Sequence, residues 1–343
     1  MDPITQQGFS AAAGAGGTEV YWAAAGYPQV AAYLWEDGFG SKFSDPSTMP
    51  TGEGEDVAFS PSNDAIAVAH RNSPYMSVYP WSSSGFGSKY SNPSSLPNER
   101  TRGVAFSPDG NAIAFGEMNS PYIRAYAWSS SGFGSKYSDP STLPPGSAWA
   151  LVFHPDGNAV AIGNNNTPSI TAYAWSSSGF GSKYSNPSTL PNGSSYDVTW
   201  NPAGNVFAVV GGGNPYVHAY AWSSSGFGSK YSNPSSAMPD AGSGVAFTSD
   251  GSVLFATAFG SPYILAYAFS SGFGSKYSNP STLPATIAHD VAVHPEDTYI
   301  VVSNGSSPPV TAYPWSSSGF GAKLSDPSPA ISNTPNGMNF SHL

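Results

Sequence analysis

The chain has 343 residues, of which 39% are hydrophobic, 14% aromatic and only 9% charged, and it contains no cysteine. An average globular domain has about 25% charged residues, so uncharged polar side chains must form most of this surface. The length and the aromatic content suffice for a sizeable core and exclude a disordered chain. A net charge of −10, with 11 Lys and Arg spread along the chain, offers no basic stripe. Nucleic acid is therefore not expected as a partner.

Simple sequence patterns argue against disulfides, metal and thiol sites, a signal peptide and a membrane helix. Without cysteine there is no disulfide framework, no thiolate-bound zinc and no thiol catalysis. The six histidines share no repeat position and no HExxH spacing occurs, so neither a metal nor a cofactor is expected. No apolar run approaches a secretory signal or the roughly 18 residues of a membrane helix, so we expect no signal peptide and no membrane insertion.

Residues 1–17 differ from the rest of the chain and are predicted to form a separate segment. Asp2 can cap a short helix and Pro3 can occupy its first turn, and the glycines at 14, 16 and 17 loosen the chain that follows. An almost uncharged helix on a glycine-rich linker suits docking to another protein. A frayed terminus is the alternative.

The sequence of this segment, MDPITQQ followed by AAAGAGG, resembles the N-terminal segment of tail, fibre and appendage proteins of marine bacteriophages. The resemblance implies a virion protein that is assembled in the host cytoplasm and docked to other virion proteins through residues 2–13. The residues that this resemblance assigns to the anchor are Asp2, Pro3, Ile4, Gln6, Gln7 and Phe9.

Residues 18–343 are predicted to form one domain of seven repeats. The triplet Gly-Phe-Gly returns every 46 or 47 residues, beginning at Gly38, Gly85, Gly132, Gly179, Gly226, Gly272 and Gly319. A unit written from residue 103 divides into four short segments, each rich in β-branched or aromatic residues and bounded by Gly, Pro, Asn or Ser. We expect strands around 104–106, 112–115, 122–128 and 135–137, and no convincing helix after residue 18.

Four antiparallel strands repeated seven times predict an all-β, seven-bladed β-propeller. The segment VAFSPDGNAIAFG resembles the first two strands of a WD40 repeat, and Trp128 lies where the third WD40 strand ends in Trp-Asp. The units differ from WD40 repeats because Ser usually replaces that Asp and the Gly-His pair is missing.

The two ends of the domain are complementary. The first unit begins at its second strand, around 18–22, whereas the chain ends on a copy of the first strand, GMNFSHL. We expect residues 337–342 to complete the blade formed by 18–45 and to close the ring, which leaves neither end as a bare sheet edge.

Regularly placed aromatic and basic residues have structural interpretations. The recurring Tyr-x-Trp pair, as in Tyr126 and Trp128, is assigned to the core rather than to sugar stacking. All seven lysines occupy one repeat position. A ring of cations could hold an anionic glycan or a symmetric partner, but we favour ammonium groups that cap carbonyls or the Asn or Asp three residues later.

Two sets of loops vary between repeats and, in a propeller, share one face. Tyr, Trp and Arg among Ser, Gly and Asn suit contact with a partner such as a host-surface glycan. The alternative is that the loop sequences vary because nothing constrains them. The predicted binding residues are Arg71, Tyr75, Arg100, Arg102, Tyr122, Trp149, Tyr196, Tyr216 and Tyr263.

No local catalytic motif is present, so the sequence favours a protein that is not an enzyme. The first hypothesis is a phage virion protein that displays a propeller, as a host-adhesion tail fibre or as capsid decoration. The second is a free carbohydrate-binding lectin with one site per blade. The third and least favoured is a propeller hydrolase whose His and carboxylates converge on the central channel.

Overall fold

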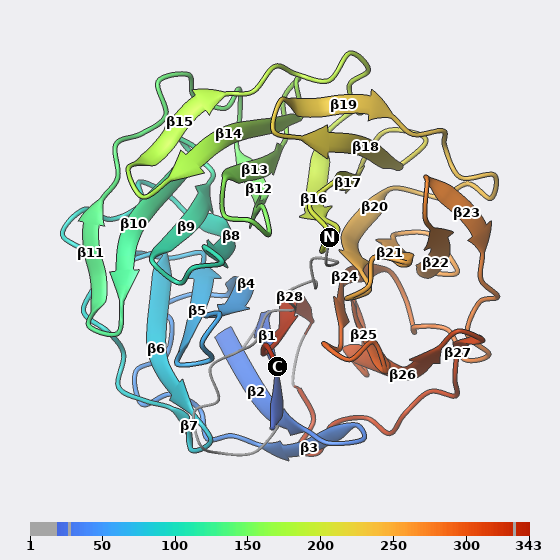
Figure 1. Cartoon of the computed structure of the whole chain (residues 1–343). Helices are drawn as coiled ribbons and strands as arrows, with labels where there is room; N and C mark the ends of the chain where they lie inside the picture. Colours follow the sequence, from blue (N-terminus) through green and yellow to red (C-terminus); the bar gives the residue numbers. More distant parts are fainter. Residues whose placement is uncertain (1–18, 27–28, 332–333) are drawn as a thin grey trace, which may run out of the picture.

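The computed structural model describes residues 19–26, 29–331 and 334–343 as a closed ring of seven four-stranded antiparallel sheets (Figure 1). This confirms the predicted seven-bladed propeller. The described residues include no helix, and so none that could cross a membrane. The segment 1–17, with the predicted anchor, lies outside the described residues.

Each blade has its strands in chain order from the channel outward, except the blade that holds both chain ends. The strands next to the channel are β4 (Gly54–Phe59), β8 (Thr101–Phe106), β12 (Ala148–Phe153), β16 (Ser195–Trp200), β20 (Gly242–Phe247), β24 (Ala288–Val293) and β28 (Pro335–Phe340). The second strands are β1 (Val20–Gly26), β5 (Ala65–His70), β9 (Ala112–Glu117), β13 (Ala159–Asn164), β17 (Val206–Gly211), β21 (Val253–Ala258) and β25 (Tyr299–Asn304).

The two outer rows complete the blades. The third strands are β2 (Gln29–Trp35), β6 (Met76–Ser82), β10 (Ile123–Ser129), β14 (Ile170–Ser176), β18 (Val217–Ser223), β22 (Ile264–Phe269) and β26 (Val310–Ser316). The outermost strands are β3 (Phe39–Lys42), β7 (Gly85–Phe86), β11 (Gly132–Lys136), β15 (Gly179–Lys183), β19 (Gly226–Lys230), β23 (Phe273–Lys276) and β27 (Gly319–Phe320).

The chain ends close the ring as predicted. β28 pairs antiparallel with β1, with Trp22 opposite Phe340 and Ala24 opposite Met338, and Figure 1 shows the two strands side by side. Met338 and Phe340 are buried, and the amide of Ser341 donates to the carbonyl of Tyr21 at 2.9 Å. The last strand of the chain is thus the innermost strand of the first blade.

The hydrophobic core lies between the blades rather than within one sheet. Seven apolar clusters are present, and each joins side chains of two neighbouring blades. Tyr126 and Trp128 are buried there, as predicted for the Tyr-x-Trp pairs. The hydroxyl of Tyr126 donates to the carbonyl of Ser95 at 2.7 Å, which satisfies its polar end inside the core.

The turn between the first two strands explains the four-residue segment that reads Ser-Pro-Asp-Gly at 107–110. Gly110 has φ = 69°, a left-handed conformation that glycine adopts without strain. Ser107 Oγ donates to Asp109 Oδ1 at 2.6 Å and accepts from the amide of Ala112 at 2.9 Å, which fixes the loop. In two other blades Asn63 and Asp297 occupy the glycine position with similar φ values.

The seven lysines have the structural role that we favoured. Each ammonium group donates to the Asn or Asp three residues later, and Lys136 also donates to the carbonyl of Tyr137 at 3.3 Å. They stand at the outer sheet edges, where charge opposes edge-to-edge pairing with another molecule.

Candidate functional site at the channel mouth

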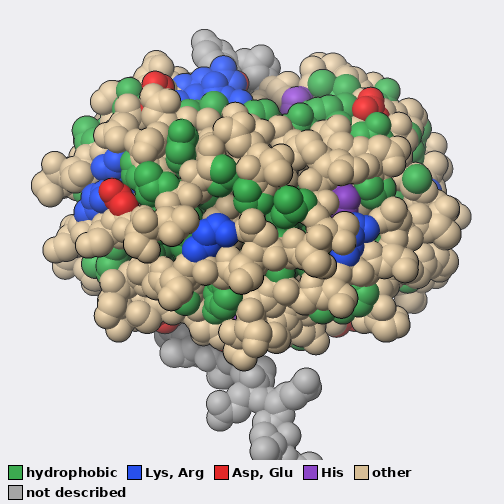
Figure 2. Space-filling model, turned by 90° about the horizontal axis from the view of Figure 1, so that it is seen from above, with side chains coloured by type: hydrophobic (Ala, Val, Ile, Leu, Met, Phe, Trp, Pro, Cys, Tyr) green, Lys and Arg blue, Asp and Glu red, His purple; other side chains and the backbone are tan. Residues whose placement is uncertain are grey.

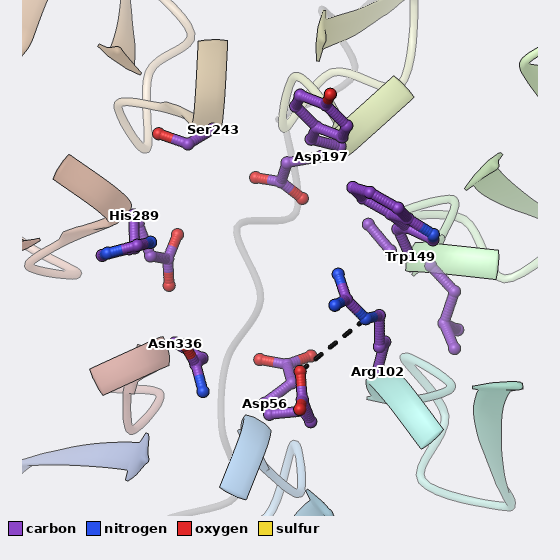
Figure 3. Close-up of a pocket in the computed structure, with 13 residues that line it drawn as sticks. Asp56, Arg102, Trp149, Asp197, Ser243, His289 and Asn336 are labelled. Carbon is purple, nitrogen blue, oxygen red and sulfur yellow. Dashed lines mark ion pairs between the residues drawn. The ribbon is translucent and has the colours of Figure 1, made fainter. Parts of the chain in front are cut away.

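A polar pocket lies in the central channel, near the starts of the innermost strands. Its volume is about 420 Å³ when the part open to solvent is counted. One register position supplies its wall: the second residue of each innermost strand. Going round the ring, these residues are Glu55, Arg102, Trp149, Tyr196, Ser243, His289 and Asn336. Seven equivalent positions thus carry seven different side chains, several of which face one another across the channel in Figure 3.

The next position of the same strands carries three aspartates that link adjacent blades. A carboxylate oxygen of Asp56 accepts from the amide of Val104 at 2.9 Å, one blade further on. Asp197 and Asp290 accept in the same way from Val245 at 2.8 Å and Met338 at 2.7 Å. These bonds fix the innermost strands relative to one another.

Each of these aspartates is followed, one blade on, by a glycine at the same register. They are Gly103, Gly244 and Gly337. A Cβ on Gly337 would lie 2.5 Å from Asp56 Oδ1, and a Cβ on Gly244 would lie 2.8 Å from the Cα of Asp290. The aspartates and glycines therefore form a matched pattern around the channel.

Burial is the main cause of the raised pKa values of these carboxyl groups. It raises the pKa of Asp56 to about 7 and that of Asp197 to about 6, although backbone N–H donors oppose the shift. The pKa of Asp290 is also raised, by burial and then by the charges of Asp197 and Asp56. The three groups line one pocket, so each makes it harder to ionise the others.

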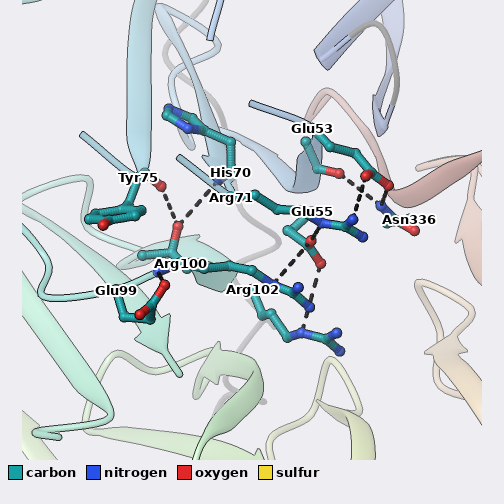
Figure 4. Close-up of polar contacts among 11 residues, drawn as sticks. Glu53, Glu55, His70, Arg71, Tyr75, Glu99, Arg100, Arg102 and Asn336 are labelled. Carbon is teal, nitrogen blue, oxygen red and sulfur yellow. Dashed lines mark hydrogen bonds and ion pairs between the residues drawn. The ribbon is translucent and has the colours of Figure 1, made fainter. Parts of the chain in front are cut away.

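A basic cluster forms one side of the pocket. Three of the four arginines in the protein surround Glu55, whose exposed fraction is 7%. Arg71 contacts Glu55 through Nε and Glu53 through Nη1, while the Nε atoms of Arg100 and Arg102 lie 3.2 and 3.8 Å from oxygens of Glu55 (Figure 4). Figure 2 shows Lys and Arg side chains gathered at one edge of the ring, in contrast to single ones along the outer wall.

Aromatic side chains continue the wall beside Arg102. The guanidinium carbon of Arg102 lies 4.5 Å from the centre of the Trp149 ring. Tyr196 stacks on Trp149 at 4.7 Å with an interplanar angle of 14°. Because these neighbours contact Trp149 by its ring faces, Trp149 acts as part of the wall rather than as a free stacking platform.

His289 lies across the channel from Arg102 (Figure 3). Burial lowers its pKa below the ordinary value of 6.5, so the imidazole is neutral at pH 7. None of the described residues makes a hydrogen bond to its ring, and its nearest aromatic neighbour is Phe259, with ring centres 6.3 Å apart. Its nitrogens are thus available to a water molecule or a ligand.

The structure brings together five of the nine residues predicted to bind. Arg102, Trp149 and Tyr196 line the pocket, and Arg71 and Arg100 join it through Glu55. The tyrosines of the other loops, Tyr75, Tyr122, Tyr216 and Tyr263, are not among its lining residues. They share a positive φ, and the Tyr75 amide donates to the carbonyl of Asn72 at 2.7 Å, which is a role in turn geometry.

Sequence reasoning missed all four acidic residues that line the pocket, and His289 itself. The residues missed are Glu55, Asp56, Asp197, Ser243, His289, Asp290 and Asn336. The signal was present, because an alignment of the repeats places one different polar or aromatic residue in each blade at a single register.

Comparison with solved structures finds propellers of the same architecture. A periplasmic gluconolactonase from Pseudomonas aeruginosa has a TM-score of 0.69 at 14% identity, with 94% of this chain and 99% of that chain covered. A putative 6-phosphogluconolactonase from Bacteroides fragilis has a TM-score of 0.73 at 10% identity, covering 94% and 98%. A protein of unknown function from Desulfotomaculum acetoxidans has a TM-score of 0.69 at 12% identity, covering 94% and 99%. No family model and no curated protein sequence matches the chain.

These findings correct two expectations. We expected a virion protein that is not an enzyme, yet two of the three similar structures are named as lactonases, actual or putative, and none of the three as a phage protein. The reason for the error is physical: a propeller assembles its site from one residue per blade, about 47 residues apart, so no local motif marks it. The predicted docking through residues 2–13, the host glycan and the virion location stay predictions.

Proposed function

We propose that the protein is a hydrolase that opens a small cyclic ester of a hydroxylated acid in the pocket at the channel mouth. One observation carries the proposal: seven structurally equivalent positions carry seven different side chains, whereas the outer strands repeat nearly unchanged. A purely structural role would not require different side chains at these seven positions. The names of two similar structures, a gluconolactonase and a putative 6-phosphogluconolactonase, support this class of substrate.

His289 is the proposed general base. A neutral imidazole can accept a proton from water as the water oxygen bonds to the ester carbonyl carbon. The same proton then passes to the ring oxygen of the ester when its bond to that carbon breaks. The products are the open hydroxy acid and the regenerated imidazole, so no further reactant is needed.

Arg102 is the proposed partner of the carbonyl oxygen. Negative charge develops on that oxygen as water attacks, and a fixed guanidinium on the opposite wall stabilises it. The carboxylates of Asp197 and Asp290 each accept backbone N–H bonds and retain lone pairs for substrate hydroxyl groups. Base, cation and hydroxyl acceptors thus surround one small volume.

Proton release during hydrolysis of glucono-1,5-lactone tests the proposal, with the spontaneous rate subtracted. We expect a rate that is proportional to protein concentration and that falls at least tenfold in His289→Gln, because general-base catalysis contributes about 10²–10⁴-fold. His342→Gln is the matched control, since His342 is exposed and contacts Asn63 at the opposite end of the channel.

The proposal fails if the folded protein does not accelerate the hydrolysis of glucono-1,5-lactone or of other hydroxylated lactones. It also fails if His289→Gln and His342→Gln retain equal activity.

A further inference from the structure

The arginine cluster holds more hydrogen-bond donors than its carboxylates can use. Each guanidinium has five N–H groups. Arg71 is engaged through two nitrogens by Glu55 and Glu53. Arg100 and Arg102 each approach Glu55 through Nε alone, and neither Nε makes a hydrogen bond within the described part of the chain although both atoms are buried.

The unused donors of Arg102 face the pocket, and those of Arg100 lie beside them. Figure 4 shows the guanidinium groups of Arg100 and Arg102 side by side, beyond Glu55, and Figure 3 shows that of Arg102 directed toward the channel. Asn336 contacts other groups, since its Nδ2 donates to Glu53 at 3.1 Å and to the carbonyl of Gly54 at 2.9 Å, and among the described residues its Oδ1 accepts from neither arginine. Two forked donor groups therefore remain for an acceptor, that of Arg102 in the pocket and that of Arg100 beside it.

Resting on the proposed function, we propose that Arg100, together with the edge of Arg102 that does not face the ester carbonyl oxygen, binds a carboxylate group of the substrate, which makes the substrate a monoanionic lactone. A carboxylate is planar and matches the guanidinium fork through two parallel N–H···O bonds. Glu55 shows that a carboxylate is accommodated among these guanidinium groups, since it accepts from Arg71 Nε and has the Nε atoms of Arg100 and Arg102 at 3.2 and 3.8 Å.

Charge selects a carboxylate rather than a phosphate. Three arginines against Glu53 and Glu55 leave the cluster with a net charge of +1. A carboxylate neutralises it. A phosphate ester carries about −1.5 to −2 charges at pH 7, which exceeds the net charge of the cluster, in a pocket where burial already raises the pKa values of Asp56, Asp197 and Asp290. A phosphorylated lactone is therefore the less favourable ligand.

Calorimetric binding to the His289→Gln protein tests this inference without turnover. The probes are D-glucaro-1,4-lactone, which carries a free carboxylate, glucono-1,5-lactone, which is neutral, and 6-phosphoglucono-1,5-lactone. We expect the carboxylate probe to bind at least tenfold more tightly than either of the others, with an affinity that decreases as salt increases.

Variants of the cluster show whether carboxylate binding depends on positive charge or on the guanidinium fork. Each variant is made in the His289→Gln background. Arg100→Gln should abolish the preference for the carboxylate probe, and Arg100→Lys should restore it only in part because lysine lacks the fork. Glu53→Gln should tighten binding of that probe. Lys89→Gln is the control for loss of one positive charge, since Lys89 lies on the outer edge and contacts Asn92. Circular dichroism confirms the fold of each variant.

The outcomes distinguish this inference from the proposed function. Equal affinity for the carboxylate and neutral probes, or tighter binding of the phosphorylated probe, overturns the carboxylate site even if lactones are hydrolysed. Selective carboxylate binding that depends on Arg100 supports the site even if no lactone is hydrolysed.

Discussion

The guanidinium Nε of Arg124 donates to Glu117 Oε1 at 2.6 Å, and both side chains are buried at one end of β9 and β10. The equivalent positions of other blades hold other matched pairs. His70 Nε2 lies 3.1 Å from Ser77 Oγ, and the buried apolar residues Ala258 and Leu265 occupy these positions in another blade. Different blades thus fill this buried position with different side chains.

Removing one partner of the Glu117–Arg124 pair should lower the free energy of unfolding far more than replacing both partners with apolar residues. Arg124→Leu leaves a buried carboxylate without its partner and should lower the free energy of unfolding by about 3–5 kcal/mol. The double variant Glu117→Ala/Arg124→Leu copies the apolar pair of another blade and should recover most of that loss. Urea unfolding of the two variants measures the difference, and a double variant no more stable than the single one would contradict the expectation.

The fold was predictable from the sequence because the same strand pattern repeats seven times. Strand positions and ring closure follow from seven copies of one alternating pattern and from two incomplete ends, as Trp22 opposite Phe340 shows. The site was not predictable, because it is formed by the residues that differ from one repeat to the next. His289 and Arg102 belong to separate repeats, and only the shared register of β24 and β8 brings them to one pocket.

Lactone hydrolysis should depend on pH through His289. The base must be neutral, and burial lowers its pKa from 6.5, so kcat/KM should rise with pH at acid values and level off below pH 6.5. Initial rates between about pH 4.5 and pH 7.5, corrected for spontaneous hydrolysis, give the midpoint. The His342→Gln protein should give the same profile, and a midpoint above 6.5 would exclude His289 as the base.

Stability should fall as pH rises through the titration of Asp56. Its folded-state pKa of about 7 lies above the ordinary aspartate value of 3.8, so the folded protein holds a proton that the unfolded chain has lost. The free energy of unfolding should therefore decrease between about pH 4 and pH 7, by at most about 1.4 kcal/mol per pH unit for one such group. Asp197 and Asp290 act in the same direction.

Urea unfolding at several pH values measures this dependence. Asp56→Asn cannot ionise, so its profile should be flatter than that of the unchanged protein over the same range. A steeper profile, or stability that increases from pH 4 to pH 7 in the unchanged protein, would show that Asp56 is ionised in the folded state well below pH 7.

Gly337→Ala should strain the point where the ring closes. The added Cβ would lie 2.5 Å from Asp56 Oδ1 and 2.8 Å from the Asp56 Cα, and the backbone atom cannot move without shifting β4 against β28. We expect the free energy of unfolding to fall by about 1–3 kcal/mol, as in other overpacked positions. Asn339→Ala in the same strand is the control, because the Asn339 side chain is only partly buried. If both variants unfold at the same urea concentration, the space beside Asp56 does not require glycine, and the alternation of aspartate and glycine at this register has another cause.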